Sequence, residues 1–341
     1  MSAGSFTCAQ LAEVQLKADS IWENASLKKD YVGKVEALSC IRSHQTVKLV
    51  DLEGAKDKTV NLIWAKDCDD TTTACGTECT VGGNELEAGC QTFTLDLCRQ
   101  ACFTVDEKDM RNKFLSKEDL IATGFLRKMR SLDEWITQQL VAKLDTFKGV
   151  NAYTGGKGTV AGFTTTVPAA FWNASLFAYF QMVGEINKFN CNYLLSGSNL
   201  FEAAQNAQWN SANADGKGAA NMFNSMDICF DLFNMDSVLT PDLATFMLDC
   251  NAVAFVSKNY YPFAMGSNQA NAWGGVGGEV GMKFQIESKN LPGVFYDVTY
   301  KITCVGNEIK HNFCLDFNGG IFRNPLGCNL NNTGILKFVC A

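Results

Sequence analysis

Apolar and polar residues follow a helical period over one unusually long stretch, residues 116–148. Apolar side chains recur every three or four positions along it, at Ile121, Phe125, Met129, Leu132, Ile136, Leu140, Leu144 and Phe147. This spacing keeps them on one face of a helix. Ser116 with Asp119 supplies an N-terminal cap, Gly124 is the only weak position inside, and Gly149 supplies a stop. The pattern predicts one helix of roughly 50 Å, longer than many small domains are wide.

The sequence before this helix predicts a short helix and then strands. The short helix begins after a capping residue, Thr7. Apolar residues alternate over 47–49 and 60–64, which predicts the two strands of a hairpin. Residues 66–89 lose this periodicity and are rich in Asp, Thr, Gly and Cys, as expected of a long irregular excursion. Alternation resumes over 93–97 and predicts a returning strand.

The sequence after the long helix predicts a mixed segment followed by strands. Residues 149–162, rich in Gly and Thr, read as a hairpin tip, and 168–190 as a strongly apolar, buried helix. A further helix is expected around 219–233. Strands are predicted over 245–248, 282–286, 298–302, 309–317 and 335–339. These elements predict an α+β fold without internal repeats.

Composition excludes several classes of protein. The 341 residues suffice for about two domains with a sizeable core. A net charge of -7 and a pI near 5.0 argue against a general nucleic-acid-binding protein, whose affinity needs basic residues that neutralise phosphates. The sequence contains no run of 18 apolar residues that would predict a membrane span. The N-terminal sequence lacks the basic and apolar regions of a secretory signal.

Cysteine is abundant and odd in number, at fifteen residues. Six cysteines lie within 35 residues before the long helix, namely Cys68, Cys75, Cys79, Cys90, Cys98 and Cys102. We interpret them as candidate disulfide cysteines, which would stiffen a loop that has almost no core of its own. Synthesis in the cytosol and later release by lysis would reconcile disulfides with the missing secretory signal. Reduced thiols and a zinc site are the alternatives, and zinc is disfavoured because the spacings contain no C-x-x-C pair.

No catalytic, cofactor-binding or metal site is predicted. Histidine chemistry is limited to His44 and His311, and His311 lies in a predicted strand, where a pairing or interface role is expected. The glycine-rich segment 154–159 fails as a phosphate loop because Asn151 and Gly158 replace required residues. The segment 273–278 contains a G-x-G, but no strand precedes it. We therefore expect no enzyme.

The order of elements resembles the major capsid protein of tailed bacteriophages, which has the Hong Kong 97 capsid fold. The segment 103–110 leading into the long helix and the segments 195–200 and 245–249 look like parts of that family. The segments 291–298 and 332–336 are similar to the C-terminal sheet of capsid proteins of some Bacteroidetes phages. The resemblance implies four parts: an N-terminal arm (1–45), an extended β-hairpin loop with a Cys-rich insertion (46–103), a peripheral domain (104–168 and 266–341) with a spine helix, and an axial domain (169–265).

The resemblance also implies the function and the partners. The chain would assemble with copies of itself, in hexamers and pentamers, into an icosahedral shell around phage double-stranded DNA. The expected location is the virion, after synthesis in the host cytoplasm. Expected partners are the portal, scaffold or decoration proteins, and packaged DNA bound without sequence specificity; no membrane and no cofactor are expected. The stripe of the spine helix is expected to pack on the C-terminal sheet.

Other functions remain open from the sequence. Within structural proteins, an encapsulin-like compartment or a tail-tube subunit has the same requirement for self-assembly. From other classes, a cysteine-rich extracellular binding or adhesion protein fits the cysteine count, and a zinc-dependent enzyme fits it less well. The long helix alone also permits a coiled-coil dimer or the core of an α+β enzyme, although its stripe shows no sustained heptad.

Overall fold

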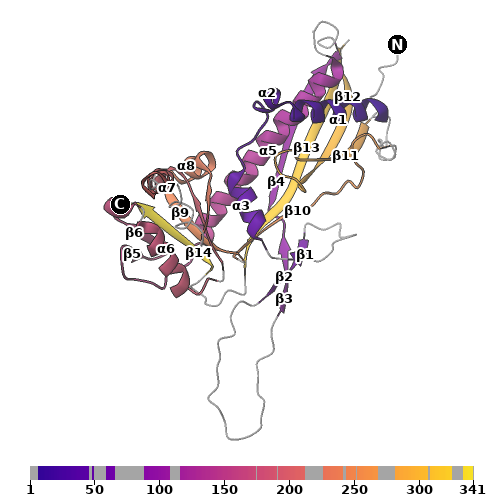
Figure 1. Cartoon of the computed structure of the whole chain (residues 1–341). Coiled ribbons are helices and arrows are strands. Elements are labelled where there is room, and N and C mark those ends of the chain that lie inside the picture. The colour runs from indigo at the N-terminus through magenta and orange to yellow at the C-terminus, as the bar shows by residue number, and fades with distance from the viewer. Residues whose placement is uncertain are drawn as a thin grey trace, which may run out of the picture. The chain divides into compact units, whose positions relative to one another are not determined.

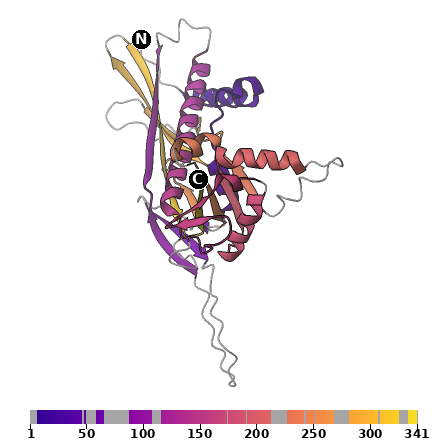
Figure 2. The same cartoon turned by 90° about the vertical axis from the view of Figure 1, so that its left-hand side faces the viewer.

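A computed structural model of the chain shows two compact units (Figures 1 and 2). It describes residues 7–45, 48–49, 59–65, 88–107, 116–173, 175–189, 191–211, 226–240, 243–250, 252–267, 281–305, 308–324 and 333–340. Unit 1 comprises Met1–Val35, Leu95–Ile136 and Val256–Gly320, and unit 2 comprises Glu36–Thr94, Thr137–Phe255 and Ile321–Ala341. Each unit combines helices with a sheet, so the expected α+β class is confirmed.

Unit 1 is built on long antiparallel strands. Strand β13 (Glu308–Arg323) pairs on one side with β12 (Phe295–Val305), which pairs with β11 (Gly281–Glu287). Along its first part β13 pairs on the other side with β4 (Leu97–Asp106), and β10 (Val253–Ser257) completes the sheet. Buried and half-buried residues alternate along β11 and most of β13, as a sheet with one covered face requires. The strands predicted here are confirmed.

The predicted long helix is α5 (Lys117–Phe147), which is unbroken over 31 residues (Figure 2). The Ser116 hydroxyl accepts a hydrogen bond from the backbone N–H of Asp119 at 3.1 Å, so the predicted cap is present. Most of the predicted stripe is buried: Ile121, Phe125, Met129, Leu132, Ile136, Leu140 and Leu144. In unit 1 the Phe125 ring lies 5.3 Å from that of Phe313 and 6.4 Å from that of Phe284. The expected packing on the C-terminal strands is thus confirmed for the stripe at Phe125, in unit 1.

Packing against the sheet explains the glycine at position 124, the weak position predicted inside the helix. A Cβ atom at Gly124 would lie 2.5 Å from a ring carbon of Phe103, which is far inside van der Waals contact. Phe103, on β4, stacks in turn on Phe313 at 5.1 Å between ring centroids. Glycine therefore lets an aromatic ring of the sheet reach the helix backbone.

The N-terminal part of unit 1 is helical. Helix α1 (Cys8–Glu23) begins with the predicted capping box, in which Thr7 and Gln10 bond each other's backbone N–H groups. It is longer than the short helix expected. Helix α2 (Ala25–Lys28) follows, capped by the Asn24 side chain. Both helices precede the segment 30–34, which contacts α5.

Unit 2 contains a six-stranded mixed sheet in the order β5-β6-β14-β9-β7-β8. Its strands are β5 (Thr159–Ala161), β6 (Thr164–Val167), β14 (Ile335–Cys340), β9 (Ala244–Asp249), β7 (Asn192–Ser196) and β8 (Asp227–Phe230). Its helices are α3 (Glu36–His44), α6 (Ser175–Ile186), α7 (Ser198–Ser211) and α8 (Leu232–Leu239), with a 3-10 turn at Ala169–Phe171. The predicted strand over 245–248 is confirmed as part of β9.

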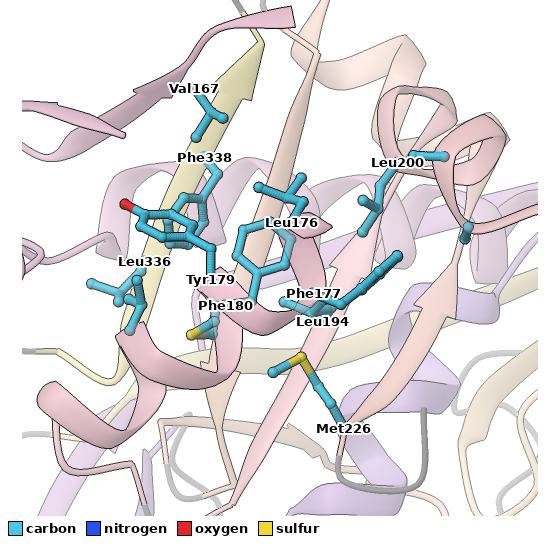
Figure 3. Packing of buried hydrophobic residues seen from close by; sticks show 14 residues of the cluster. Val167, Leu176, Phe177, Tyr179, Phe180, Leu194, Leu200, Met226, Leu336 and Phe338 are labelled. Atoms are coloured by element: carbon cyan, nitrogen blue, oxygen red, sulfur yellow. The ribbon is translucent and has the colours of Figure 1, made fainter. Parts of the chain in front are cut away.

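The core of unit 2 lies between α6 and the sheet (Figure 3). Phe180 of α6 packs edge-on against Phe338 of β14, with 4.9 Å between ring centroids. The predicted apolar helix of 168–190 is thus largely buried, although it begins only at Ser175. Met182 and Ile186 remain 39% and 43% exposed. Aromatic pairs of this kind contribute about 0.5–1.5 kcal/mol each beyond the burial of their area.

A small antiparallel sheet in unit 2 contains the predicted hairpin. Strand β1 (Lys48–Leu49) pairs with β2 (Thr59–Ala65), and β2 pairs with β3 (Ala88–Thr94). The connection between these two strands and most of the excursion 66–89 lie outside the described residues. The single returning strand predicted over 93–97 is two strands in different sheets, because β3 ends at Thr94 and β4 begins at Leu97. Alternation marks which residues are buried; it does not identify the pairing partner.

Two further expectations differ from the structure. The helix expected around 219–233 is wrong over 227–230, where β8 pairs parallel with β7; Asp231 then caps α8. Residues 219–225 lie outside the described residues. The last strand, β14, lies between β6 and β9 of the six-stranded sheet and does not join β11–β13. The apolar run 335–339 is buried without strict alternation, which suits a central strand covered on both faces.

Candidate functional site

A buried carboxylate on the long helix organises unit 1. Asp133 has no exposed surface, and Ser288, between β11 and β12, donates its hydroxyl to both carboxylate oxygens at 2.9 Å. The Tyr296 hydroxyl and the Asn290 amide also donate to Asp133, the amide at 2.8 Å. Buried donors that lack an acceptor are costly, so this set of bonds fixes the helix on the β11–β12 connection.

Burial dominates the electrostatics of this group. Removal from water raises the pKa of Asp133 from 3.8 to about 6, while the hydrogen bonds from Tyr296, Asn290 and Ser288 act in the opposite direction. Glu134 raises the same pKa through charge repulsion. Burial beside this carboxyl also raises the pKa of Tyr296 well above its ordinary value. The phenol therefore stays protonated and remains a donor.

The same polar cluster holds the N-terminal segment. The Asn290 side-chain oxygen accepts from the backbone N–H of Gly33 at 2.9 Å, while its amide group contacts the Tyr31 carbonyl at 3.5 Å. Arg130, one helical turn before Asp133, donates to the Asp30 carbonyl at 3.0 Å. Residues 30–34 thus lie along α5, held mostly through their backbone. Such contacts depend little on the side chains of the segment itself.

Ion pairs extend this attachment to α1. Lys289 lies 2.5 Å from Asp19, and Lys17 lies 3.7 Å from Asp119 of the long helix. Both pairs are partly exposed, and each contributes at most about 1 kcal/mol. They orient α1 more than they stabilise it.

The candidate disulfide cysteines fall into three groups. Cys102 of β4 is bonded to Cys314 of β13, directly opposite in the ladder, so its partner lies outside the cluster of six. Cys98 is a free, exposed thiol. Cys68, Cys75 and Cys79 lie outside the described residues, as does the side chain of Cys90. A disulfide within the loop therefore stays a prediction.

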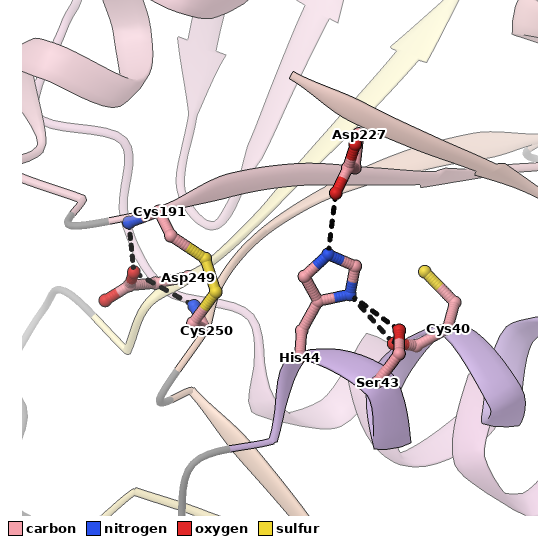
Figure 4. Close-up of a disulfide and its surroundings, with 7 residues drawn as sticks. All are labelled: Cys40, Ser43, His44, Cys191, Asp227, Asp249 and Cys250. Carbon is pink, nitrogen blue, oxygen red and sulfur yellow. Dashed lines mark hydrogen bonds and ion pairs between the residues drawn. A yellow bond between two sulfur atoms is a disulfide. The ribbon is translucent and has the colours of Figure 1, made fainter. Parts of the chain in front are cut away.

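Among the described residues, two disulfides that sequence reasoning did not single out lie in unit 2. Cys40 of α3 is bonded to Cys229 of β8. Cys191 is bonded to Cys250 at the ends of β7 and β9 (Figure 4). The partners are separated by 189 and 59 residues in sequence. No spacing rule connects such distant cysteines, so only the fold could identify these pairs.

The two histidines have different surroundings. His311, in β13, is buried, and its Nδ1 lies 2.8 Å from the Tyr300 hydroxyl. Burial lowers the pKa of His311 to about 4, so the neutral ring is stable at physiological pH. This strand position agrees with the pairing role expected for it. His44 lies on α3 and contacts Asp227, as described below.

His44, Ser43 and Asp227 lie together, but they lack the geometry of a nucleophilic triad. The Ser43 hydroxyl donates to the Cys40 carbonyl at 2.7 Å, within its own helix. His44 Nδ1 lies 2.9 Å from that carbonyl and 3.1 Å from the Ser43 hydroxyl. A base for serine must accept the hydroxyl proton, and here the shorter contact of the hydroxyl is to the carbonyl oxygen, to which it donates that proton.

The remaining features indicate no ligand chemistry in the described ranges. Among these residues, no group of three or more His, Cys, Asp and Glu side chains is placed to hold a metal ion. No described helix is long and apolar enough to cross a membrane. The glycine-rich segment 154–159 packs on aromatic rings: a Cβ at Gly158 would lie 2.5 Å from the Tyr179 hydroxyl. It therefore serves packing.

Large apolar side chains are exposed on both units. In unit 1 they are Leu16, Leu27 and Val32, and in unit 2 they are Phe163, Phe171, Met182, Ile186, Leu232 and Phe233. Leu16 is 69% exposed and Phe233 is 50% exposed. Single exposed apolar residues are common, whereas adjacent ones such as Leu232 and Phe233 are candidates for contact with another chain.

Comparison with known proteins gives matches among solved structures alone. No protein-family model and no curated protein matches the sequence. The capsid of a native GTA particle is 9% identical with a TM-score of 0.47, and the match covers 90% of both chains. The capsid of cyanophage P-SCSP1u is 10% identical with a TM-score of 0.45, covering 84% of both.

A third match is the capsid asymmetric unit of cyanophage Pam1, at 10% identity and a TM-score of 0.45. It covers 85% of this chain and 87% of that chain. All three are similarities in the path of the chain, with TM-scores below 0.5, and they do not place the chain in a family. The function is therefore argued from the chain's own elements.

Proposed function

We propose that this chain is a major capsid protein of the Hong Kong 97 type, which assembles into an icosahedral shell around phage double-stranded DNA. The observation that carries the proposal is α5. It is an unbroken helix of 31 residues that contributes buried residues to both units. At 1.5 Å per residue it is roughly 46 Å long. A shell subunit has use for such a rod, because it must present contact surfaces far apart on one rigid body.

The parts of the chain fit the proposal in the order they occur. We assign 1–45 as the N-terminal arm and 46–103 as the extended hairpin loop. The peripheral domain would comprise 104–168 and 266–341 with the spine helix, and the axial domain 169–265. Strands β5, β6 and β14 are exceptions to these bounds, because they share a sheet with β7–β9 of the axial segment. Support comes from segment 30–34, which lies along α5, from α1, which has an ion pair to α5, and from the hairpin strands β1–β3, which precede β4 and α5 in sequence.

Self-assembly would use many weak contacts. Each subunit of a closed shell repeats the same surfaces around symmetry axes, so modest interfaces add up to a stable particle. Unit 2 offers exposed apolar side chains for such contacts, among them the adjacent residues Leu232 and Phe233 and the side of α6 at Met182 and Ile186. We propose copies of this chain, in hexamers and pentamers, as their partners.

The other partners follow from the same proposal. A portal and scaffold or decoration proteins would complete the particle, whose location is the virion. The net charge of -7 suits a shell that encloses DNA without binding its sequence. The closer likeness to capsids of Bacteroidetes phages rests on the segments 291–298 and 332–336 and stays part of the proposal.

Electron microscopy of the purified, full-length chain tests the proposal. The protein is concentrated stepwise, alone and with the other structural proteins of its source, and imaged in negative stain. Closed shells of uniform diameter are expected. Filaments would favour a tail-tube subunit, and shells enclosing a protein cargo instead of DNA would favour an encapsulin-like compartment. Monomers under every condition would contradict self-assembly.

A further inference from the structure

Helix α3 is joined to strand β8 and to the residue that follows it by three contacts in register. Figure 4 shows one of them, between His44 and Asp227. The contacts from α3 come from Ala37, Cys40 and His44, which lie on one helix face because their spacing is three and four residues. The other contacts come from Asp227 and Cys229 of β8 and from Asp231, which follows the strand; these are alternate residues, as expected for one side of an extended segment. Ala37, the first of the helix residues, contacts Asp231, and His44, the last, contacts Asp227. The helix and the strand therefore run in opposite directions.

The three contacts differ in chemistry. The backbone N–H of Ala37 donates to Asp231 at 3.0 Å, a bond that is buried. Cys40 and Cys229 form the disulfide, with Cα atoms 6.3 Å apart. His44 Nε2 lies 3.1 Å from the carboxylate of Asp227. We call this set, Ala37–Asp231, Cys40–Cys229 and His44–Asp227, the α3 clasp.

The ionic end of the clasp is held in one orientation. The His44 ring stacks on Tyr193 of β7, with 4.2 Å between centroids and an interplanar angle of 7°. Tyr193 is paired directly with Asp227 across the two strands. Nδ1 faces the Cys40 carbonyl and Nε2 faces the Asp227 carboxylate, so both ring nitrogens point at acceptors. Both bonds form when both ring nitrogens carry protons.

We propose that the α3 clasp is a redox-controlled attachment, which is non-covalent in a reducing cell and becomes covalent after oxidation. With the thiols reduced, α3 keeps its buried residues Ala37, Leu38 and Ile41 and two polar contacts of the clasp, one of them largely exposed, since Asp227 is 79% exposed. An ion pair of this exposure adds little. The two polar contacts keep Cys40 opposite Cys229, and the disulfide then makes the contact permanent.

The oxidation step needs an external disulfide. A reducing cytosol keeps the thiols of Cys40 and Cys229 reduced. Release from the cell exposes them to low-molecular-weight disulfides. One cysteine thiolate attacks such a disulfide, forms a mixed disulfide and releases one small thiol. The other thiolate then displaces the second small thiol. Two protein thiols are oxidised to one disulfide, and one small disulfide is reduced to two thiols.

The clasp acts on the N-terminal segment. Helix α3 follows that segment directly and belongs to unit 2, whose sheet contains β8 at its edge. Locking α3 therefore fixes the point at which the segment enters unit 2. The inference concerns this chain whether or not it forms a shell, so it can fail or hold independently of the proposed function.

Hydrogen exchange followed by mass spectrometry tests the clasp on the full-length protein. Amide exchange in 36–44 is compared for protein oxidised with glutathione disulfide and protein reduced with dithiothreitol. Exchange is expected to rise at least tenfold on reduction, and Cys40→Ser is expected to reproduce this rise without reductant. Alkylation during lysis is expected to label Cys40 and Cys229 before exposure to oxidant and not afterwards.

Two matched variants separate the clasp from a general loss of structure. Cys191→Ser removes the other disulfide of unit 2 and is expected to leave exchange in 36–44 unchanged. His44→Gln is expected to speed exchange several-fold in reduced protein and to change it little in oxidised protein. Equal exchange in the two redox states, or an equal effect of Cys191→Ser and Cys40→Ser, would overturn the proposal.

Discussion

Asp133 gives unit 1 a pH dependence of unusual sign. Its pKa is raised by burial from 3.8 to about 6, so between these values the folded chain keeps a proton that the unfolded chain has lost. The folded state therefore binds more protons, and the free energy of unfolding falls as pH rises through this window. Most paired carboxylates act in the opposite direction.

The magnitude follows from the two pKa values, which differ by about 2. One pKa unit corresponds to 1.36 kcal/mol, so ionisation of Asp133 removes about 3 kcal/mol of stability between acid and neutral pH. This conversion is justified because the side chain has no exposed surface. Asp297 also titrates in this range, because burial raises its pKa to about 6. A comparison of variants at Asp133 cancels that contribution.

Asp133→Asn removes the titration and keeps the side-chain volume. The amide group of Asn290, which donates to Asp133 in the parent, then faces the amide of the new side chain. The Asn290 side chain cannot flip to present its oxygen instead without losing the hydrogen bond from the Gly33 N–H. One buried donor left unpaired costs about 1–3 kcal/mol. The variant is therefore expected to be about 1–3 kcal/mol less stable than the parent near pH 4.5, and equally or more stable at pH 7.5, where the parent bears the buried charge.

Urea unfolding at several pH values measures this difference. Trp135 lies two residues after Asp133 on α5 and is one of six tryptophans, so tryptophan fluorescence includes a signal from the unit concerned. Ser288→Ala is the matched control: it removes a donor that stabilises the carboxylate, so it should raise the pKa of Asp133 further and make the loss with pH larger. A parent-minus-variant difference for Asp133→Asn that stays constant from pH 4.5 to 7.5 would refute the reasoning.

Two further predictions concern packing, and a third concerns assembly. Phe125→Ala should lower the free energy of unfolding by about 3–5 kcal/mol, measured by urea unfolding, because it empties a site between three aromatic rings. Gly124→Ala should cost about 1–3 kcal/mol in the same assay, although alanine favours helices, because its Cβ meets the Phe103 ring; a gain in stability would contradict this packing. Phe233→Ser should raise the protein concentration needed for shells in electron microscopy and leave the melting temperature unchanged, because the ring is exposed; an unchanged threshold would exclude Phe233 from the contacts.

The sequence predicted the elements that rest on local patterns. The stripe of α5, its cap at Ser116 and the alternating strands after residue 281 follow from periods of 3.6 and 2, which a single segment contains in full. Pairing needs information from distant segments. The alternation over 93–97 therefore looked like one strand, and 227–230 looked helical because nothing local indicates that it pairs with β7.

In the candidate site, too, the features that depend on distant segments could not be predicted from the local sequence. Asp133 is one acidic residue inside an amphipathic helix, and its sequence neighbours do not show that Ser288, Asn290 and Tyr296 converge on it. The cysteine cluster drew attention to the loop, yet Cys102 is bonded to Cys314, 212 residues away.

The long sequence separation of the disulfide partners also determines how much each disulfide stabilises the folded chain. A disulfide that closes a loop of this length removes more entropy from the unfolded chain than one between neighbours, on the order of 5 kcal/mol in the chain-entropy account. Cys102–Cys314 joins β4 to β13, and Cys40–Cys229 joins α3 to β8, so each joins segments on opposite sides of α5 in sequence. If cytosolic thiols are reduced, this stabilisation is absent during folding and arrives only afterwards. The chain must therefore fold on packing and on polar contacts such as those of Asp133, and oxidation then slows the unfolding of a structure that already exists.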